Sequence, residues 1–204
     1  MPYLKLEVGG LQTNAYLFYS ILSRRCFVID PGAEAGKIIA LIEREKLMPL
    51  AVILTHNHAD HVGAVAEILG HFNIPLWVYE SDEKTMRSQP NREIAAMFAV
   101  TLPPAAERLL ADGETIGSDD LTLTVIHSPG HTPGSILLHG AGLLFTGDTL
   151  FRGDVGRTDL PGGDEEQLQR SLARIREFPA ATVVLPGHGE TSTVELELAT
   201  NPYL

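Results

Sequence analysis

Short apolar runs rich in β-branched residues alternate with amphipathic stretches along the chain. The short runs have the length of strands and end in turn residues, and the longer stretches carry apolar residues at helical spacing. The runs that we predict as strands are 15–21, 27–29, 51–54, 74–79, 121–126, 136–138, 143–145 and 183–185. The stretches that we predict as helices are 34–48, 62–69, 82–100 with an interruption at Pro90, and 165–177. This mixture predicts a layered α/β or α+β fold with a substantial sheet.

The chain of 204 residues has a size that one hydrophobic core can organise. No Ser/Gly linker, charge block, low-complexity tract or short tandem repeat divides it. The Pro103-Pro104 pair is predicted as a loop inside the domain. We therefore predict one domain over residues 1–204. The helix at 165–177 has a clear start, because Asp164 is a suitable N-cap and Gln167 follows three residues later.

The charge balance limits the partners. The chain has 15 basic and 26 acidic residues, a formal net charge of −11, which repels nucleic-acid phosphates and anionic lipid headgroups. We expect neither nucleic acid nor a membrane as a partner. No targeting pattern or membrane-length apolar run is present, so we expect a cytoplasmic protein. The single cysteine, Cys26, lies in an apolar run and is predicted to be a small buried hydrophobic residue.

The most informative segment follows the predicted strand 51–54. It reads His56-Asn57-His58-Ala59-Asp60-His61 and holds four metal-binding side chains within six residues. In an extended segment residues two apart share a face, so we expect His56, His58 and Asp60 to point the same way. His61 would reach from the other side as the chain turns into the next helix. One segment could thus supply two neighbouring metal positions.

Three later motifs repeat this design, in which a strand leads into a turn with one potential ligand. They contain His131, Asp148 and His188. All the ligand motifs would lie at the carboxyl ends of strands, where open α/β sheets gather their functional loops. Five histidines and two aspartates suffice for two metal ions, with Asp148 as the natural bridge. Imidazole and carboxylate ligands without thiolate suit zinc, iron or manganese and do not choose among them.

These motifs together resemble the metallo-β-lactamase fold superfamily, whose HxHxDH signature stands here at residues 56–61, followed in the expected order by His131, Asp148 and His188. The resemblance implies an αββα sandwich of two mixed sheets. It also implies the distribution of the ligands: one metal ion is held by His56, His58 and His131, the other by Asp60, His61 and His188, and Asp148 bridges.

Within the superfamily the chain is most similar to short glyoxalase II-like proteins (hydroxyacylglutathione hydrolases). The likeness rests on the segments 147–151 and 156–159 and on the ending Asn201-Pro202-Tyr203. It implies a thioesterase with two divalent metal ions, zinc first, with iron or manganese as alternatives. A water molecule between the ions, its pKa lowered towards ~7, would attack the thioester carbonyl, and Asp60 would orient it. A thiol of pKa ~8.5 can leave as the anion, so no dedicated acid is required.

Two further residues each have two interpretations. Arg157 falls near a position where glyoxalase II enzymes bind a glutathione carboxylate, and it could instead form a local ion pair with Asp159. Asp30 could hydrogen-bond a ligand imidazole, or it could simply form the Asp30-Pro31-Gly32 turn. The longer enzymes bind glutathione with a helical C-terminal extension, and this sequence ends soon after His188, which leaves the thiol half of the substrate open.

Other activities stay open at this point. The segment 156–159 is also compatible with persulfide dioxygenases, in which His56, His131 and Asp148 would hold a single ferrous ion. A lactonase is a further alternative. True β-lactamases are disfavoured, because they carry cysteine or serine where Asp148 stands. The sequence does not define the oligomeric state.

Overall fold

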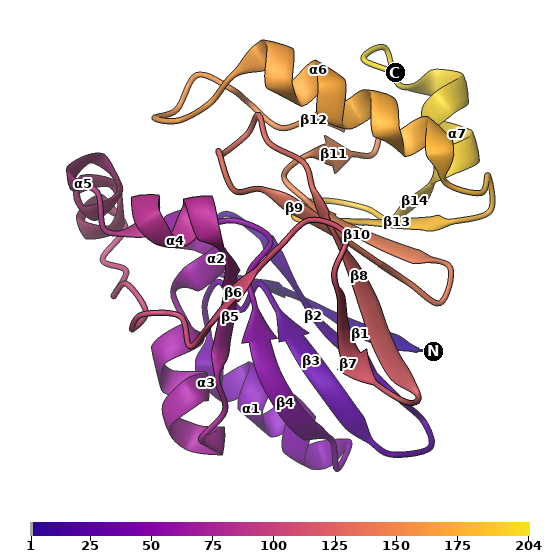
Figure 1. Ribbon diagram of the computed structural model, residues 1–204. Helices are drawn as coiled ribbons and strands as arrows, with labels where there is room; N and C mark the ends of the chain where they lie inside the picture. The colour runs from indigo at the N-terminus through magenta and orange to yellow at the C-terminus, as the bar shows by residue number, and fades with distance from the viewer. Residues whose placement is uncertain (1) are drawn as a thin grey trace.

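The computed structural model describes residues 2–204, and two six-stranded sheets face each other in it (Figure 1). The strands of the first sheet, in spatial order, are β1 (Tyr3–Val8), β2 (Thr13–Tyr19), β3 (Arg25–Ile29), β4 (Met48–Ile53), β5 (Leu76–Tyr79) and β6 (Arg108–Leu110). Those of the second sheet are β14 (Ser192–Thr193), β13 (Val183–Pro186), β10 (Leu143–Gly147), β9 (Ile136–Gly140), β8 (Leu121–His127) and β7 (Thr115–Ser118). Both sheets are mixed: β3 to β6 are parallel, as are β10 and β13.

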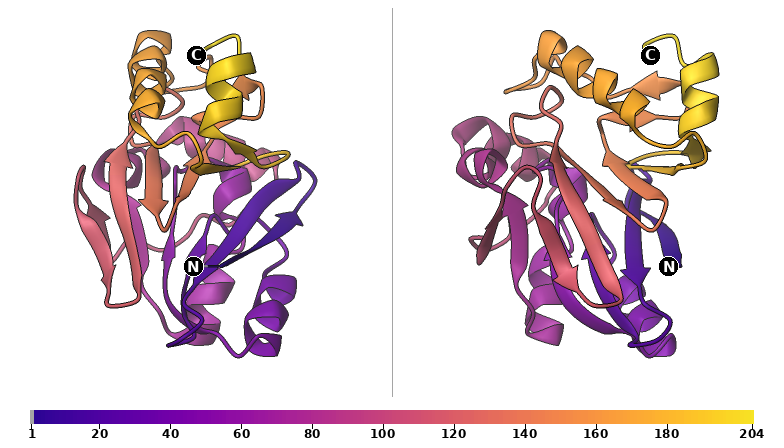
Figure 2. Two further views of the ribbon diagram at one scale, coloured as in Figure 1. Left: turned by 90° about the vertical axis from the view of Figure 1, so that its right-hand side faces the viewer. Right: turned by 45° about the vertical axis from the view of Figure 1, so that its right-hand side comes forward.

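Helices cover the outer face of each sheet. The helices α1 (Ala35–Arg44) and α3 (Val65–Phe72) pack on the first sheet, and α6 (Glu165–Ala173) and α7 (Val194–Thr200) pack on the second. Figure 2 shows the same succession of layers from two further sides. The remaining elements are α2 (Ala59–Val62), α4 (Glu80–Met86), α5 (Gln89–Met97), a 3-10 helix (Arg174–Glu177) and the small pair β11 (Leu150–Phe151) and β12 (Asp154–Val155). The predicted αββα sandwich is confirmed.

The alternation of side chains along β3 shows why the strands read as continuous apolar runs. Cys26 and Val28 pack against α1 and α3, whereas Phe27 and Ile29 point between the two sheets. Both faces of the strand are buried, so both must be apolar. Cys26 is completely buried, and burial raises the pKa of its thiol to about 12. This confirms the prediction that Cys26 serves as a buried hydrophobic residue.

The predicted helices are shortened, divided or shifted in the structure, and the one predicted over 62–69 is found as α3 (Val65–Phe72). The helix predicted over 34–48 ends at Arg44, since Lys46 adopts a left-handed backbone and Met48 and Pro49 already belong to β4. The stretch 82–100 is divided into α4 and α5. Ser88 caps α5 by accepting the N–H of Asn91, and Pro90 lies in the first turn, where its missing N–H costs nothing.

The start of α6 agrees with the prediction from the sequence, whereas several strands were not predicted. Asp164 accepts the N–H of Gln167 at 2.9 Å and caps α6 as predicted. The strands β1, β6 and β7 were not predicted, because they lie at sheet edges and each has only one fully buried residue. Within residues 2–204, none of the helices has the length and apolar character needed to cross a bilayer.

Candidate metal centre

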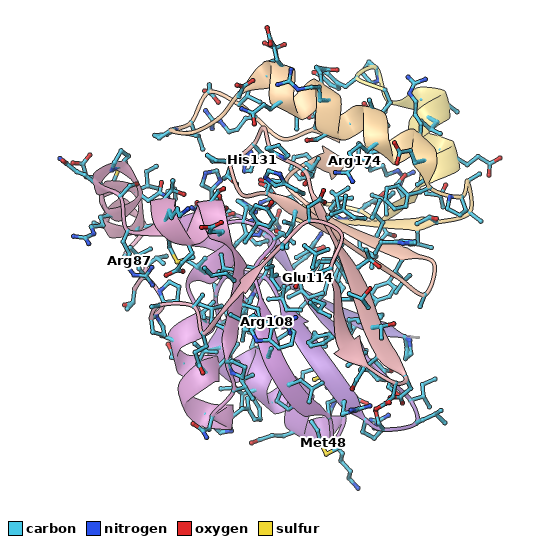
Figure 3. All side chains as sticks on the ribbon, viewed as in Figure 1. Met48, Arg87, Arg108, Glu114, His131 and Arg174 are labelled. Atoms are coloured by element: carbon cyan, nitrogen blue, oxygen red, sulfur yellow. The ribbon has the colours of Figure 1, made fainter. Side chains whose placement is uncertain are left out.

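Four loops at the carboxyl ends of strands bring the predicted ligands together. His56 follows β4 and His131 follows β8, while Asp148 comes directly after β10 and His188 shortly after β13. In Figure 3, His131 lies in the upper half of the view, below α6, and Met48, where β4 begins, lies at the bottom. The two sheets therefore converge on one site, as the position of the motifs predicted.

The first cluster consists of His56, His58 and His131, each of which offers one ring nitrogen within 4.8 Å of the others. All three side chains are buried. Among the described residues, the Nε2 atoms of His56 and His131 have no hydrogen-bond partner. A buried polar atom without a partner is costly, and a metal ion would satisfy both nitrogens. The donor set thus fits a divalent metal ion.

The second cluster consists of Asp60, His61 and His188, again with ligand atoms within 4.8 Å of one another. The Nε2 atom of His188 lies 3.2 Å from Asp60 Oδ2. Asp148 lies between the clusters: its Oδ1 is 3.3 Å from His61 Nε2, and its Oδ2 is 3.6 Å from the Nε2 atoms of both His131 and His188. Asp148 is the carboxylate placed to contact both metal positions.

One local prediction at this segment is wrong. The segment after His58 is not extended, because α2 begins at Ala59 instead of after His61. Asp60 is therefore carried by a helical turn, away from the face that His56 and His58 share, and belongs to the second cluster. The two clusters are nevertheless the two ligand sets that the family resemblance implies.

Backbone carbonyl groups fix the tautomer of two histidines. His131 Nδ1 lies 2.8 Å from the carbonyl oxygen of Arg157, and His188 Nδ1 lies 3.1 Å from that of Leu11. A carbonyl oxygen only accepts hydrogen bonds, so Nδ1 carries the proton in both rings. The Nε2 lone pairs are thereby left for the clusters.

Asp30 is linked to a ligand of each cluster, directly to His61 and through Thr55 to His56. Its Oδ2 accepts the N–H of His61 Nδ1 at 3.1 Å and the hydroxyl of Thr55 at 2.5 Å, and its Oδ1 accepts the backbone N–H of Thr55 at 2.7 Å. The Thr55 hydroxyl oxygen in turn lies 3.1 Å from His56 Nδ1. Because the Thr55 proton is given to Asp30, His56 Nδ1–H donates to Thr55. Asp30 thus orients two ligands, as the first interpretation from the sequence predicted. Residues 30–32 form neither a hydrogen-bonded turn nor a bend, so the turn interpretation is not supported.

The charges differ between the clusters. Burial lowers the pKa of His56 well below its usual value, and the nearby imidazole of His61 lowers it further; burial also lowers the pKa of His58 to about 3. These rings are neutral at pH 7 and able to bind metal. Burial opposes the charged form of His61 as well, but the carboxylates of Asp148 and Asp60 outweigh it and raise the pKa of His61. Metal binding at the second cluster must therefore release a proton.

The fold also requires glycine close to the ligands. A Cβ on Gly187 would lie 2.1 Å from Asp148 Oδ1 and 2.8 Å from His61 Cε1. A Cβ on Gly32 would lie 1.7 Å from the carbonyl oxygen of Asp60. The loops approach one another so closely that no larger residue fits at these positions.

Two supporting residues were missed in the sequence. The hydroxyl of Thr13 on β2 donates to Asp60 Oδ2 at 3.0 Å. The buried carboxylate of Asp82 in α4 accepts the hydroxyl of Thr132 at 2.9 Å and the N–H of Gly134 at 2.7 Å, which anchors the loop of His131. Nothing local reveals either contact, because an acidic residue in the first turn of a helix normally stabilises the helix alone.

A cavity of about 530 Å³ opens above both clusters. Its walls are Leu11 from the β1–β2 turn, Ile94, Met97 and Phe98 from α5 and its end, and Arg157 with Leu160. The guanidinium of Arg157 forms two 2.6 Å hydrogen bonds with the carboxylate of Asp159, and both side chains are exposed. The predicted ion pair is thus present, and Arg157 also lines the cavity.

This fold and this set of strand-end ligands are those of a metal-dependent hydrolase. A model of the metallo-beta-lactamase superfamily matches residues 8–188, and the chain belongs to that superfamily.

Three similar proteins illustrate the range of the superfamily. The hydroxyacylglutathione hydrolase GloC of Haemophilus influenzae is 35% identical over 98% of this chain and 96% of its own. The crystal structure of TTHA1623 in a di-iron-bound form is 39% identical, with a TM-score of 0.90 over 98% of this chain and all of the other. The crystal structure of the B3 metallo-beta-lactamase BLEG-1 is 33% identical, with a TM-score of 0.89 over all of this chain and 99% of the other.

Replacing Asp30 by asparagine tests its hold on both clusters. The substitution Asp30→Asn removes a carboxylate that accepts from His61 and Thr55, so the ligand rings lose their fixed orientation. We expect about 10- to 100-fold weaker metal binding by calorimetric titration. Asp120→Asn, which alters a carboxylate bound to Ser20 and Arg25 instead, is the control and should keep the wild-type affinity. Equal affinity in wild type and Asp30→Asn would contradict this role.

The raised pKa of the buried Asp82 carboxyl group predicts that the stability of the protein depends on pH. Burial raises the pKa of its carboxyl group to about 7, above the ~3.9 of an unfolded aspartate, so the folded state binds the additional proton between these values. The contribution of Asp82 to the free energy of unfolding of the metal-free protein should therefore fall as the pH rises from about 4 to about 7. The variant Asp82→Asn lacks this contribution, which reaches about 1.4 kcal/mol per pH unit. Urea unfolding at several pH values should give diverging curves for the two proteins; parallel curves would refute the assignment.

Proposed function

We propose that this protein is a binuclear metal-dependent thioesterase of the glyoxalase II type. Its substrate would be an S-2-hydroxyacylglutathione or a related small-molecule thioester. The GloC relative, which carries this activity in its name, supports the proposal. The two ligand clusters, both of which contact Asp148, support it as well. The net charge of −11 supports a small-molecule partner over nucleic acid or a membrane surface, and we propose the cytoplasm as its compartment.

The composition of the cavity carries the proposal. Among the described residues that line it, Asp148 contacts both clusters, and Arg157 is the one titratable side chain apart from Asp148 and the two clusters. Asp159 holds Arg157 as a cation. The site therefore offers no separate acid to protonate a leaving group. An amine needs such a proton, whereas a thiol of pKa ~8.5 leaves as the thiolate near neutral pH. A thioester is the substrate class that matches this site.

Metal ions held by the two clusters would lower the pKa of a bound water and polarise the substrate carbonyl. The protein residues provide the positioning. Asp60, held by the hydroxyl of Thr13, is placed to accept a hydrogen bond from the attacking water. Leu11, Arg157 and Asp30 hold the imidazoles with their Nε2 atoms towards the clusters.

Arg157 is the candidate contact for an anionic substrate group. Its guanidinium is exposed, and it lines the cavity on the side of His131. The ion pair with Asp159 does not exclude this role, because exposed ion pairs are weak and a substrate carboxylate can share the planar guanidinium.

Anaerobic hydrolysis of S-lactoylglutathione tests the proposed function. We expect release of free thiol by the metal-loaded protein, with a loss of at least 100-fold in His58→Ala because one metal position loses a ligand. His71→Ala, which alters an exposed histidine at the end of α3, should keep full activity.

Absence of turnover would overturn the thioesterase assignment. A β-lactam assayed in parallel would show whether the activity named for BLEG-1 is present instead. One iron per chain and oxygen uptake with glutathione persulfide would support the dioxygenase alternative.

The kinetics of Arg157→Ala test the anion contact. Loss of a charge-assisted contact to the substrate should raise KM for S-lactoylglutathione about tenfold and leave kcat nearly unchanged. Arg170→Ala, on the exposed face of α6, should behave as wild type. An unchanged KM in Arg157→Ala would remove the residue from substrate binding.

A further inference from the structure

A second cavity, of about 350 Å³, adjoins the one above the clusters. The two cavities share Leu11, Asp60 and Phe98, so they meet directly beside the second cluster. The second cavity lies between the β1–β2 turn and the segment that follows β3. The other residues that line it are Val8, Gly9, Gly10, Thr13, Gly32, Ala33 and Val100.

The lining of this cavity is apolar. Asp60 is its single charged side chain among the described residues, and it already accepts the hydroxyl of Thr13 and belongs to the second cluster. Thr13 adds a hydroxyl, which is already donated to Asp60, and the rest of the wall is aliphatic or aromatic side chain and glycine backbone. A charged group placed here would lose its hydration without gaining a partner, whereas a hydrocarbon would gain free energy.

Two exposed apolar side chains stand where the cavities meet. Leu11 is 50% exposed and Phe98 is 53% exposed, and Met97 beside them is 82% exposed. Large apolar side chains gathered around a concave surface are typical of a ligand contact. A ligand that extended from one cavity into the other would contact Leu11 and Phe98.

The two ends of the combined site differ in charge. Arg157, whose carbonyl oxygen accepts a hydrogen bond from His131, lies at one end. Leu11, whose carbonyl oxygen accepts a hydrogen bond from His188, lies at the other end. The clusters lie between a cationic end and an apolar end. A bound thioester would therefore place its anionic thiol arm towards Arg157 and an uncharged arm towards Leu11 and Phe98.

We propose that the second cavity binds the acyl arm of the substrate and that this arm is a hydrocarbon chain or an aryl group, larger than a small hydroxyacyl group. The inference rests on the proposed thioesterase function. A cavity of about 150 Å³ with apolar walls holds a benzene molecule. A volume of 350 Å³ is thus ample for a medium-length acyl chain.

Gly10 offers a way to fill the cavity. A Cβ at Gly10 would meet no atom within 4 Å, and its φ is not positive, so a larger side chain can be added without a clash or backbone strain. Gly10→Leu would occupy part of the cavity. Gly36→Leu, at an open position of α1, is the matched control. Ala33→Leu narrows the cavity from the segment after β3 and serves as a second variant if Gly10→Leu is unstable.

The test is the hydrolysis of S-acylglutathiones with acetyl, butyryl, hexanoyl and octanoyl chains by the metal-loaded protein. We expect kcat/KM to rise about fourfold per methylene group until the cavity is filled, which is the fold-change that ~0.8 kcal/mol per buried methylene gives. In Gly10→Leu, the ratio of kcat/KM for the octanoyl thioester to that for the acetyl thioester should be at least tenfold smaller than in the wild type. In Gly36→Leu this ratio should be the same as in the wild type. A series that does not rise in the wild type, or that rises equally in Gly10→Leu, would overturn the proposal.

Binding of the free acids separates this inference from the proposed function. Calorimetric titration with acetate, hexanoate and octanoate needs no turnover. If no thioester is hydrolysed but octanoate binds more tightly than acetate, and less tightly to Gly10→Leu than to Gly36→Leu, the cavity assignment stands and the thioesterase assignment fails. If affinity does not depend on chain length, the cavity assignment fails whatever the protein hydrolyses.

Discussion

The buried carboxylate of Asp30 is the constraint on which the arrangement of the site depends. It lies at the end of β3 and binds Thr55 at the end of β4, so it joins two neighbouring parallel strands. Through these contacts it orients His61 directly and His56 through Thr55. Its backbone adopts a left-handed conformation, which aspartate tolerates better than most residues and which the surrounding structure must maintain.

Packing between the two sheets places the remaining ligand loops around Asp30. The apolar layer between them includes Phe145, whose ring packs edge-on against Tyr16 and Phe18 and connects β10 with β2. The hydroxyl of Tyr16 then donates to the carbonyl oxygen of Pro186 at 2.7 Å, which fixes the loop of His188. Ligands from both sheets are thus placed by a rigid scaffold and not by the loops alone, as a binding site for metal ions requires.

The sequence predicted the features that depend on neighbouring residues. The ligand motifs, their position at strand ends and the cap of α6 by Asp164 all follow from local patterns. The predicted start of α2 was wrong, because a histidine-rich segment has no apolar periodicity that distinguishes an extended backbone from a helical one. The contacts of Thr13 and Asp82 were out of reach, since each joins segments that lie far apart in the sequence. The two adjoining cavities are likewise a product of tertiary packing between α5 and the β1–β2 turn.

The number of metal ions per chain tests the central claim most directly. Native mass spectrometry of the protein saturated with zinc, and separately with ferrous iron under anaerobic conditions, counts the ions without reference to any substrate. Two clusters that both contact Asp148 predict two ions per chain at saturation. A single ion per chain with both metals would contradict the binuclear centre and the hydrolytic chemistry built on it.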